Sequence, residues 1–166
     1  MIKQRRGAKS VGIRLSVYIE LMLFKEYISH VKQSLGFMGK VSHTEVIEML
    51  LKEFLHPNTV ADTTDSKSVK YNEWLETQDI EALKSTKIKS VVGTNSKFKS
   101  FTLPTDIVTK LTNLCTYLSY GYPYKIDVSY VILILLNRYA YHDYTGIKLP
   151  DEFIQKFIEW ELSVSS

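Results

Sequence analysis

One pattern occurs twice in this 166-residue chain: a short alternating segment followed by two helix-like runs. The alternating segments are Val11 to Ser16 and Lys99 to Pro104. Ile13 and Leu15 match Phe101 and Leu103 at an offset of 101 − 13 = 88 residues. An internal repeat constrains architecture more strongly than any single motif. We therefore expect a mainly α protein in which a short strand followed by two helices occurs twice.

The match extends through both helix-like runs. Ile19 and Leu23 align with Ile107 and Leu111 at the same offset. The second runs align at an offset of 131 − 46 = 85, and their apolar positions are Val46, Ile47, Leu50, Leu51 and Phe54 against Val131, Ile132, Leu135, Leu136 and Tyr139. The first copy is thus expected to carry 88 − 85 = 3 extra residues before its second helix.

Capping signals mark where the helices begin and end. Ser16 is expected to cap the first helix, and Ser42 begins a Ser-x-x-Glu capping box. In the second copy, Pro104 suits the first turn of a helix and Asp127 suits an N-cap. The apolar stripes are expected at Ile19, Leu23, Tyr27 and Val31 in the first copy and at Ile107, Leu111, Leu114, Cys115 and Leu118 in the second. Gly36 and Gly39 break the first copy between its helices.

The chain divides into four segments on this pattern. Residues 1–57 hold a basic arm and the first copy, and residues 98–142 hold the second copy. Residues 58–97 are expected to form a linker, with a helix from Asn72 to Leu83 and a basic connection after it. Residues 143–166 are expected to hold an amphipathic helix from Pro150 to Leu162.

Composition excludes several classes of protein. The chain is 45% hydrophobic and 23% charged, which is typical of a globular protein. It contains no apolar run near the ~20 residues that cross a bilayer, and no secretory leader pattern. A single cysteine excludes an internal disulfide framework and agrees with a reducing compartment such as the cytoplasm.

Positive charge is concentrated beside the two alternating segments. Residues 1–14 contain five basic and no acidic side chains, and so do residues 82–99. Acidic side chains collect elsewhere, in residues 60–81 and 150–166. Two solvated basic tails are one interpretation of this distribution. A surface that faces phosphates explains better why both blocks adjoin equivalent strands.

The repeated strand, helix, glycine turn and capped helix resemble the ribbon-helix-helix superfamily of DNA-binding proteins, of the MetJ, Arc and CopG type. The resemblance covers residues 10–56 and 98–141, a little over half the chain. It is carried by Gly12-Ile13-Arg14-Leu15-Ser16 and Gly39-Lys40-Val41-Ser42-His43-Thr44-Glu45-Val46-Ile47, with their counterparts Ser100-Phe101-Thr102-Leu103-Pro104 and Tyr124-Lys125-Ile126-Asp127-Val128-Ser129. Two copies in one chain also resemble tandem proteins of the TraY type.

The resemblance implies sequence-specific binding of double-stranded DNA by an intrachain pseudo-dimer, a monomer that can assemble further on DNA. The two strands would pair antiparallel into one ribbon that enters the major groove. The second helices would aim their N-termini at phosphates. The implied base-reading residues are Ser10, Gly12, Arg14, Phe98, Ser100 and Thr102. The implied phosphate contacts are Lys3, Arg5, Arg6, Lys9, Lys40, Ser42, His43, Lys97, Lys125 and Val128.

Four residues depart from the family pattern. Gly12 offers no side chain for reading a base, and Phe98 suits at most a thymine methyl group. Lys99 stands where an inward apolar residue is expected, and Asp127 places negative charge near a phosphate. The second half is therefore expected to bind DNA more weakly, or the ribbon to end irregularly.

No other chemistry emerges from the sequence. Four histidines, at positions 30, 43, 56 and 142, lack metal-ligand spacing, and Cys115 lies on an apolar helical face. The eleven tyrosines fit packing better than base stacking. We expect no enzyme, metal or cofactor. The task would be transcriptional regulation or organisation of plasmid, viral or transfer-origin DNA. The alternative is a helical protein-interaction module, such as an antitoxin-like or assembly factor, and the C-terminal helix is a further candidate for binding a protein partner.

Overall fold

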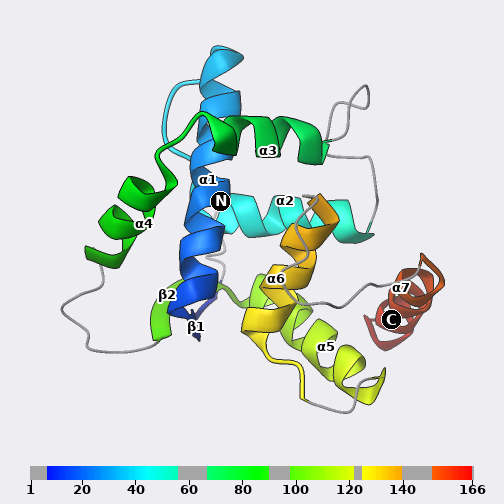
Figure 1. Cartoon of the computed structure of the whole chain (residues 1–166). Coiled ribbons are helices and arrows are strands. Elements are labelled where there is room, and N and C mark those ends of the chain that lie inside the picture. The colour runs from blue at the N-terminus through cyan, green and yellow to red at the C-terminus, as the bar shows by residue number, and fades with distance from the viewer. Residues whose placement is uncertain (1–6, 56–66, 90–97, 122–124, 140–150, 166) are drawn as a thin grey trace, which may run out of the picture.

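The computed structural model describes residues 7–55, 67–89, 98–121, 125–139 and 151–165. Within these ranges the chain forms seven helices and one two-stranded antiparallel sheet (Figure 1). The elements are β1 (Ala8–Arg14), α1 (Leu15–Ser34), α2 (His43–Leu55), α3 (Lys67–Glu76), α4 (Ile80–Lys89), β2 (Phe98–Pro104), α5 (Thr105–Gly121), α6 (Val128–Tyr139) and α7 (Asp151–Ser165). No helix within these ranges is long and apolar enough to cross a membrane.

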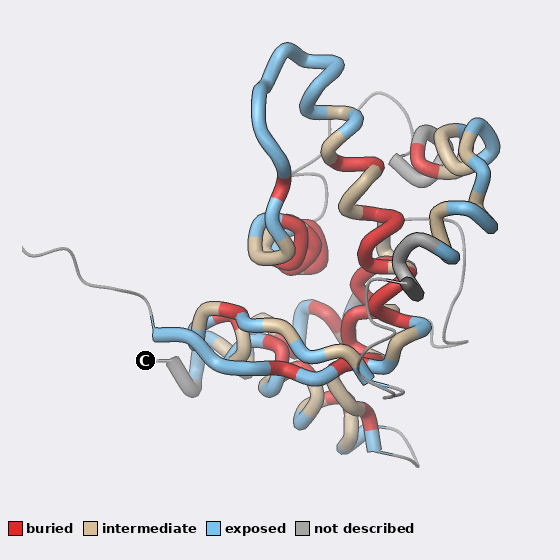
Figure 2. Tube along the Cα trace, turned by 90° about the vertical axis from the view of Figure 1, so that its left-hand side faces the viewer, coloured by how far each residue is buried: buried red, intermediate tan, exposed pale blue. Residues whose placement is uncertain are grey.

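β1 and β2 form a ribbon whose two faces differ. Val11 and Ile13 of β1 and Leu103 of β2 are buried against the helices. The alternate residues, Ser10, Gly12, Arg14, Phe98, Ser100 and Thr102, are exposed. Figure 2 shows this alternation of buried and exposed residues along the strands. The period of two seen in the sequence therefore predicted both the strands and their outward face.

The starts of the strands and helices correct the offset that relates the two copies. β1 begins at Ala8 and β2 begins at Phe98, and 98 − 8 = 90. The helices α1 and α5 also begin 90 residues apart, at Leu15 and Thr105. At this offset Lys9-Ser10 matches Lys99-Ser100 identically. The expected offset of 88 is wrong for the helices, and the first copy carries 90 − 85 = 5 extra residues before its second helix.

The core face of α1 confirms the offset of 90. Its central-core residues Val17, Leu21, Phe24 and Ile28 correspond to the buried residues Ile107, Leu111, Leu114 and Leu118 of α5. Ile19 and Leu23 are buried as well, but they lie outside the central core cluster. α1 packs against α3 and α4 in addition to α2 and α6, so apolar residues surround much of the helix. The apolar stripe expected from the sequence, with Ile19 and Leu23 beside Tyr27, therefore combined residues from two faces of α1.

The second helices of the two copies pack against each other. α2 and α6 begin 85 residues apart, as expected, and their aligned apolar residues Val46, Ile47, Leu50 and Leu51 and Val131, Ile132, Leu135 and Leu136 are all buried. Both expected caps are present. The Glu45 N–H donates to Ser42 Oγ at 3.2 Å, and the Tyr130 N–H donates to Asp127 Oδ1 at 3.0 Å.

Two other start signals were wrong. α1 begins at Leu15 with no side-chain cap, so Ser16 lies inside the helix. Pro104 ends β2, and α5 begins one residue later. The Thr105 N–H donates to the Gly7 carbonyl oxygen at 2.8 Å, which ties the start of α5 to the residue before β1.

The region between the copies is more helical than expected. Instead of one helix from Asn72 to Leu83, α3 and α4 are separated by a break at Asp79, whose Oδ1 accepts from the Ala82 N–H at 3.1 Å. α4 continues to Lys89, through residues expected to form a basic connection. Nζ of Lys84 in α4 lies 3.9 Å from Oε1 of Glu20 in α1. These helices cover the outer side of α1.

α7 adds a helix outside the repeated pattern. Its residues Ile154 and Phe157 are buried. Phe157 lies in edge contact with Tyr117 of α5, at 5.3 Å between ring centroids, and with Phe54 of α2, at 6.4 Å. The C-terminal helix therefore covers the junction of the two copies with its apolar face.

Candidate nucleic-acid interface

The outward face of the ribbon brings the six expected base-reading residues together. In the pairing register Ser10 lies opposite Thr102, Gly12 opposite Ser100, and Arg14 opposite Phe98. The three hydroxyl groups of Ser10, Ser100 and Thr102 and the Arg14 guanidinium are all on exposed residues of this face. They offer hydrogen-bond donors and acceptors in a surface two strands wide.

The corrected offset also changes which residues correspond. At the offset of 90, Ser10 corresponds to Ser100, and Gly12 corresponds to Thr102. Arg14 corresponds to Pro104, so the expected equivalence of Arg14 with Thr102 is wrong. One end of the face thus carries Arg14 beside Phe98, and the other carries Ala8 beside Pro104. The centre of the face is symmetric in character and its ends are not.

Arg14 is connected to the N-terminus of α6 in two ways. Its backbone N–H donates to Ser129 Oγ at 2.9 Å, and Ser129 is buried. Its guanidinium lies 3.9 Å from the Asp127 carboxylate, with both side chains about half exposed. Asp127 thus caps α6 with one carboxylate oxygen and faces Arg14 with the other. Sequence reasoning missed Ser129, because a polar residue in an apolar helix gives no hint of its partner.

The N-terminus of α2 has a different environment. Ser42 supplies an uncharged cap, and Glu45 accepts a hydrogen bond from Lys32 Nζ at 3.1 Å. The His43 ring stacks on Phe101 at 5.4 Å and on Tyr18 at 6.2 Å. The ring therefore packs beneath the ribbon, and its Nε2 is buried without a hydrogen-bond partner. A phosphate near this site would meet the backbone amides of α2 rather than the imidazole.

Burial and two cations disfavour a charged His43. Desolvation lowers the pKa of His43, and the positive charges of Lys25 and Lys99 lower it further. Lys99 also lies 5.9 Å from the centre of the Tyr18 ring. This contact explains how a lysine occupies an inward position of β2, since its charged end lies over an aromatic face at the edge of the ribbon.

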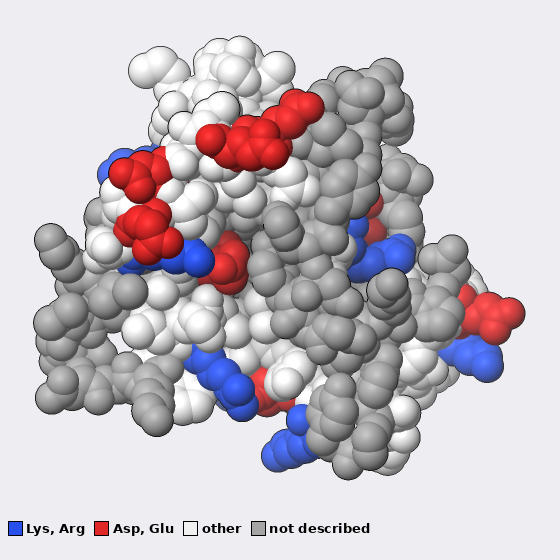
Figure 3. Space-filling model, viewed as in Figure 1, with Lys and Arg blue, Asp and Glu red and all other residues white. Residues whose placement is uncertain are grey.

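Exposed lysines lie in the ribbon and just before the second helices. Lys9 belongs to β1, and Lys40 and Lys125 stand at matching positions before α2 and α6. Figure 3 shows basic side chains at the lower edge of one face, near the ribbon of Figure 1, beside an acidic one; further basic side chains lie at the left and right, and acidic ones lie over α3. Lys3, Arg5, Arg6 and Lys97 lie outside the described residues, and the side chain of Val128 is half-buried.

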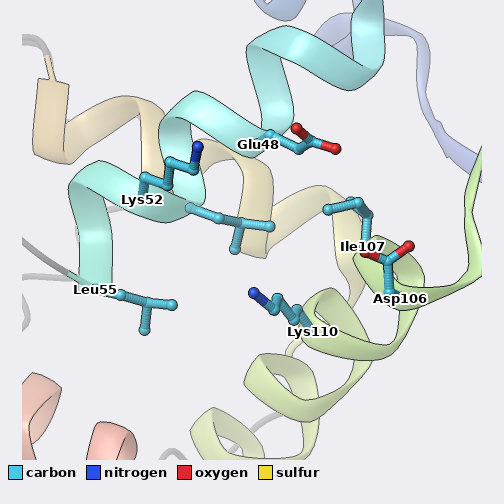
Figure 4. A pocket seen from close by; sticks show the side chains of 7 residues that line it. Glu48, Lys52, Leu55, Asp106, Ile107 and Lys110 are labelled. Atoms are coloured by element: carbon cyan, nitrogen blue, oxygen red, sulfur yellow. The ribbon is translucent and has the colours of Figure 1, made fainter. Parts of the chain in front are cut away.

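A hollow of about 430 Å³ lies between α2 and α5 (Figure 4). Its lining residues are Glu48, Leu51, Lys52, Leu55, Asp106, Ile107 and Lys110. On each helix the acid precedes the lysine by four residues, the spacing of a stabilising pair on one helix. Two acids and two lysines give the hollow no net charge that would select an anion or a cation. Its composition is that of a solvated groove between helices.

Other reactive groups give no site. Among the described residues, no group of three His, Cys, Asp or Glu side chains could hold a metal ion. Cys115 packs at the edge of the core, and burial, with a smaller effect from the Asp127 charge, raises its pKa to about 11. Its thiol is therefore protonated and weakly nucleophilic at neutral pH.

Comparison with known proteins adds no relative to this description. No protein-family model, no curated protein and no solved structure matches the chain.

Proposed function

We propose that the chain is a tandem ribbon-helix-helix protein that binds duplex DNA by placing its ribbon in the major groove. The observation that carries this proposal is the outward face of the ribbon, where hydroxyl groups and one guanidinium belong to exposed residues. The major groove of B-DNA admits a two-stranded ribbon, and its base edges present hydrogen-bonding groups and thymine methyls. The hydrogen-bonding groups would be contacted by the hydroxyl groups of Ser10, Ser100 and Thr102. A thymine methyl group would be contacted by Phe98.

In the proposed complex, the N-termini of α2 and α6 would bind DNA phosphates on either side of the ribbon. α2 packs near β2 and α6 near β1, so one N-terminus flanks each strand. Free amides and the helix dipole favour an anion there, and Lys40 and Lys125 add positive charge. Contacts of this kind fix the position of the ribbon on DNA, while the outward side chains supply the sequence preference.

The two halves would bind unequally. Ser42 caps α2 without charge, whereas Asp127 places a carboxylate where a phosphate would approach α6. Arg14 lies at only one end of the ribbon. We therefore expect the target to be an imperfect palindrome whose two halves differ in strength.

The biological task that fits this activity is transcriptional regulation, or organisation of plasmid, viral or transfer-origin DNA. The proposal includes no enzymatic step and no cofactor. A monomeric chain would suffice to bind one site, because both strands of the ribbon belong to the same chain.

The proposal is tested by selecting duplexes from a random pool and measuring binding of the selected site by fluorescence anisotropy. Arg14→Ala should weaken binding about 10- to 100-fold and relax preference at one position, as expected for loss of an arginine–guanine contact. Thr102→Ala, which removes an outward hydroxyl group from the opposite strand, should weaken binding less. A folded Arg14→Ala protein that binds as tightly as the parent would contradict the proposed reading surface.

A second candidate function is protein interaction through helical surfaces without base reading. The exposed apolar turn between α1 and α2 favours it. Salt separates the two functions, because duplex binding weakens steeply as salt rises and apolar association does not.

A further inference from the structure

The turn between α1 and α2 exposes a cluster of apolar side chains. Leu35 is 70% exposed, Phe37 is 63% exposed and Met38 is 96% exposed. Figure 2 shows this turn as a pale blue loop at the top of the molecule. Single exposed apolar residues are ordinary, but a contiguous group at a protruding turn is typical of an interaction surface.

The backbone holds this turn in one conformation. The Phe37 N–H donates to the Lys32 carbonyl oxygen and the Gly36 N–H to that of Gln33, each at 3.0 Å. With Gly36 at a φ of +90°, this is the Schellman arrangement that ends many helices. The residue in the position of Phe37 often packs back on the last helical turn, yet here it points outward. Little conformational freedom would be lost when a partner covers it.

A groove of about 500 Å³ adjoins the turn, between the end of α1 and α3. Its lining residues are Tyr27, His30, Val31, Ser34, Leu35, Glu73, Trp74 and Thr77. Trp74 forms its aromatic floor, with Tyr27 at 5.7 Å and His30 at 6.4 Å between ring centroids. Leu35 belongs to both the groove and the turn, so the protrusion and the hollow lie side by side on one face.

We propose that a second copy of this chain binds here, with Phe37 and Met38 of each copy seated in the groove of the other. A two-fold interface needs a patch that complements itself. A protrusion beside a hollow meets this need, because rotation about an axis near Leu35 brings each protrusion to the partner's hollow.

The charges on this face complement each other in the same way. Residues 32–40 carry Lys32 and Lys40 and no acid. Glu73 of α3 lines the groove and is exposed, and Glu76 is exposed near the end of the same helix. Exchange of the turns would place the lysines of one copy near the glutamates of the other. Lys32 already bonds to Glu45, so Lys40 is the lysine that best reports this contact.

The association is expected to be weak in free solution. A stable interface buries about 1,200–2,000 Å² in total, whereas this contact would consist of one short turn and one groove from each copy. The turn stands at the end of α1 opposite to the ribbon, so both surfaces can be used at once (Figure 1). If the proposed function holds, two copies on neighbouring DNA sites would gain a high effective concentration and bind cooperatively. The pairing itself needs no DNA.

Sedimentation equilibrium without DNA tests the pairing, from micromolar to millimolar concentrations of the full chain. The parent should form dimers reversibly. The double variant Phe37→Ser/Met38→Ser should raise the dissociation constant at least about tenfold, as loss of two apolar anchors implies. Tyr120→Ser is the matched control, since Tyr120 of α5 is 85% exposed and lies outside this face. It should leave the constant unchanged.

A charge exchange makes the test specific to the two-fold arrangement. Lys40→Glu and Glu73→Lys should each weaken the dimer, and their combination should restore it. A parent that stays monomeric throughout, a Tyr120→Ser effect equal to that of the double variant, or no recovery in the combined variant would overturn the proposal. Pairing in a chain that fails to bind duplexes would refute the proposed function and leave this inference standing.

Discussion

The residue that most affects how the two halves differ is Asp127. Its carboxylate caps α6 and lies 3.9 Å from the Arg14 guanidinium, at the helix end where a phosphate would approach. The corresponding residue of the first copy, Ser42, makes the same kind of cap without charge. The pair Arg14–Asp127 is half exposed, so its contribution to stability is small. In the proposed DNA complex, repulsion between Asp127 and a phosphate would change affinity more than the ion pair changes stability.

We expect Asp127→Ser to keep the fold and to increase affinity for all duplexes, by about 3- to 10-fold at low salt, because repulsion of phosphate is removed. The salt dependence of binding should become steeper. Ser42→Asp, the reverse change in the other copy, should have the opposite effect. Filter-binding titrations over a series of salt concentrations measure both. Equal affinity in all three proteins would mean that these helix ends do not meet phosphates.

His43 makes the stability of the fold depend on pH. Burial and the nearby lysines Lys25 and Lys99 lower its pKa in the folded chain, while the unfolded chain keeps a value of about 6.5. The unfolded chain therefore binds the proton first as the pH falls. Stability that is fully present above the unfolded pKa is lost as the pH falls through the folded pKa.

Replacing His43 by Phe should preserve stacking between Tyr18 and Phe101 and remove this part of the pH dependence. Urea unfolding at pH 7.5 and at a pH below about 6.5 gives the comparison. The parent should lose more stability on acidification than His43→Phe. Equal losses in the two proteins would show that protonation of His43 is not coupled to unfolding.

At the scale of the elements, α7 is part of the core and not an appendage. Phe157 is almost fully buried between Tyr117 and Phe54, which belong to different copies of the repeated pattern. Phe157→Ala should destabilise the chain by about 3–5 kcal/mol, the usual cost of removing a buried phenyl ring. Leu162→Ala, at a position that is 67% exposed on the same helix, should change stability by less than about 0.5 kcal/mol. Chemical denaturation measures both, and similar small effects would place α7 outside the folded core.

The elements also show where sequence patterns succeed and fail. Alternation in β1 and β2 and the caps at Ser42 and Asp127 are local signals, and the structure confirms them. The offset between the copies was wrong in the first helix. There, Ile19 and Leu23 have the same four-residue spacing as Val17 and Leu21, and both sets are buried because α1 packs against α3 and α4 as well as α2 and α6. Periodicity alone cannot tell which face meets the central core.

Contacts between segments far apart in the sequence could not be predicted either. The bond from the Arg14 N–H to Ser129 joins residues 115 positions apart, and neither residue alone predicts it. The stack of His43 between Tyr18 and Phe101 joins three elements, and the sequence around His43 gives no sign of it. The outward face of the ribbon, in contrast, could be predicted, because exposure along a strand follows its period of two.

At the scale of the whole molecule, one chain builds a continuous core from both copies of the strand-helix-helix order. The strands pair with each other, α2 packs on α6, and α7 contacts both halves. The outward face of the ribbon and the apolar turn lie at opposite ends of α1 (Figure 1). This separation would let the proposed DNA contact and the proposed contact with a second copy form at the same time.

If the outward face of the ribbon binds DNA as proposed, one negative charge added to that face should oppose binding. Ser100 lies opposite Gly12 near the centre of that face. Ser100→Glu should lower affinity for the selected duplex about 100-fold or more, because the added carboxylate repels the phosphate groups. Gln155→Glu adds the same charge on the exposed side of α7 and should leave affinity within about twofold. Anisotropy titrations of the two folded variants give the answer. Ser100→Glu binding as well as Gln155→Glu would contradict the account.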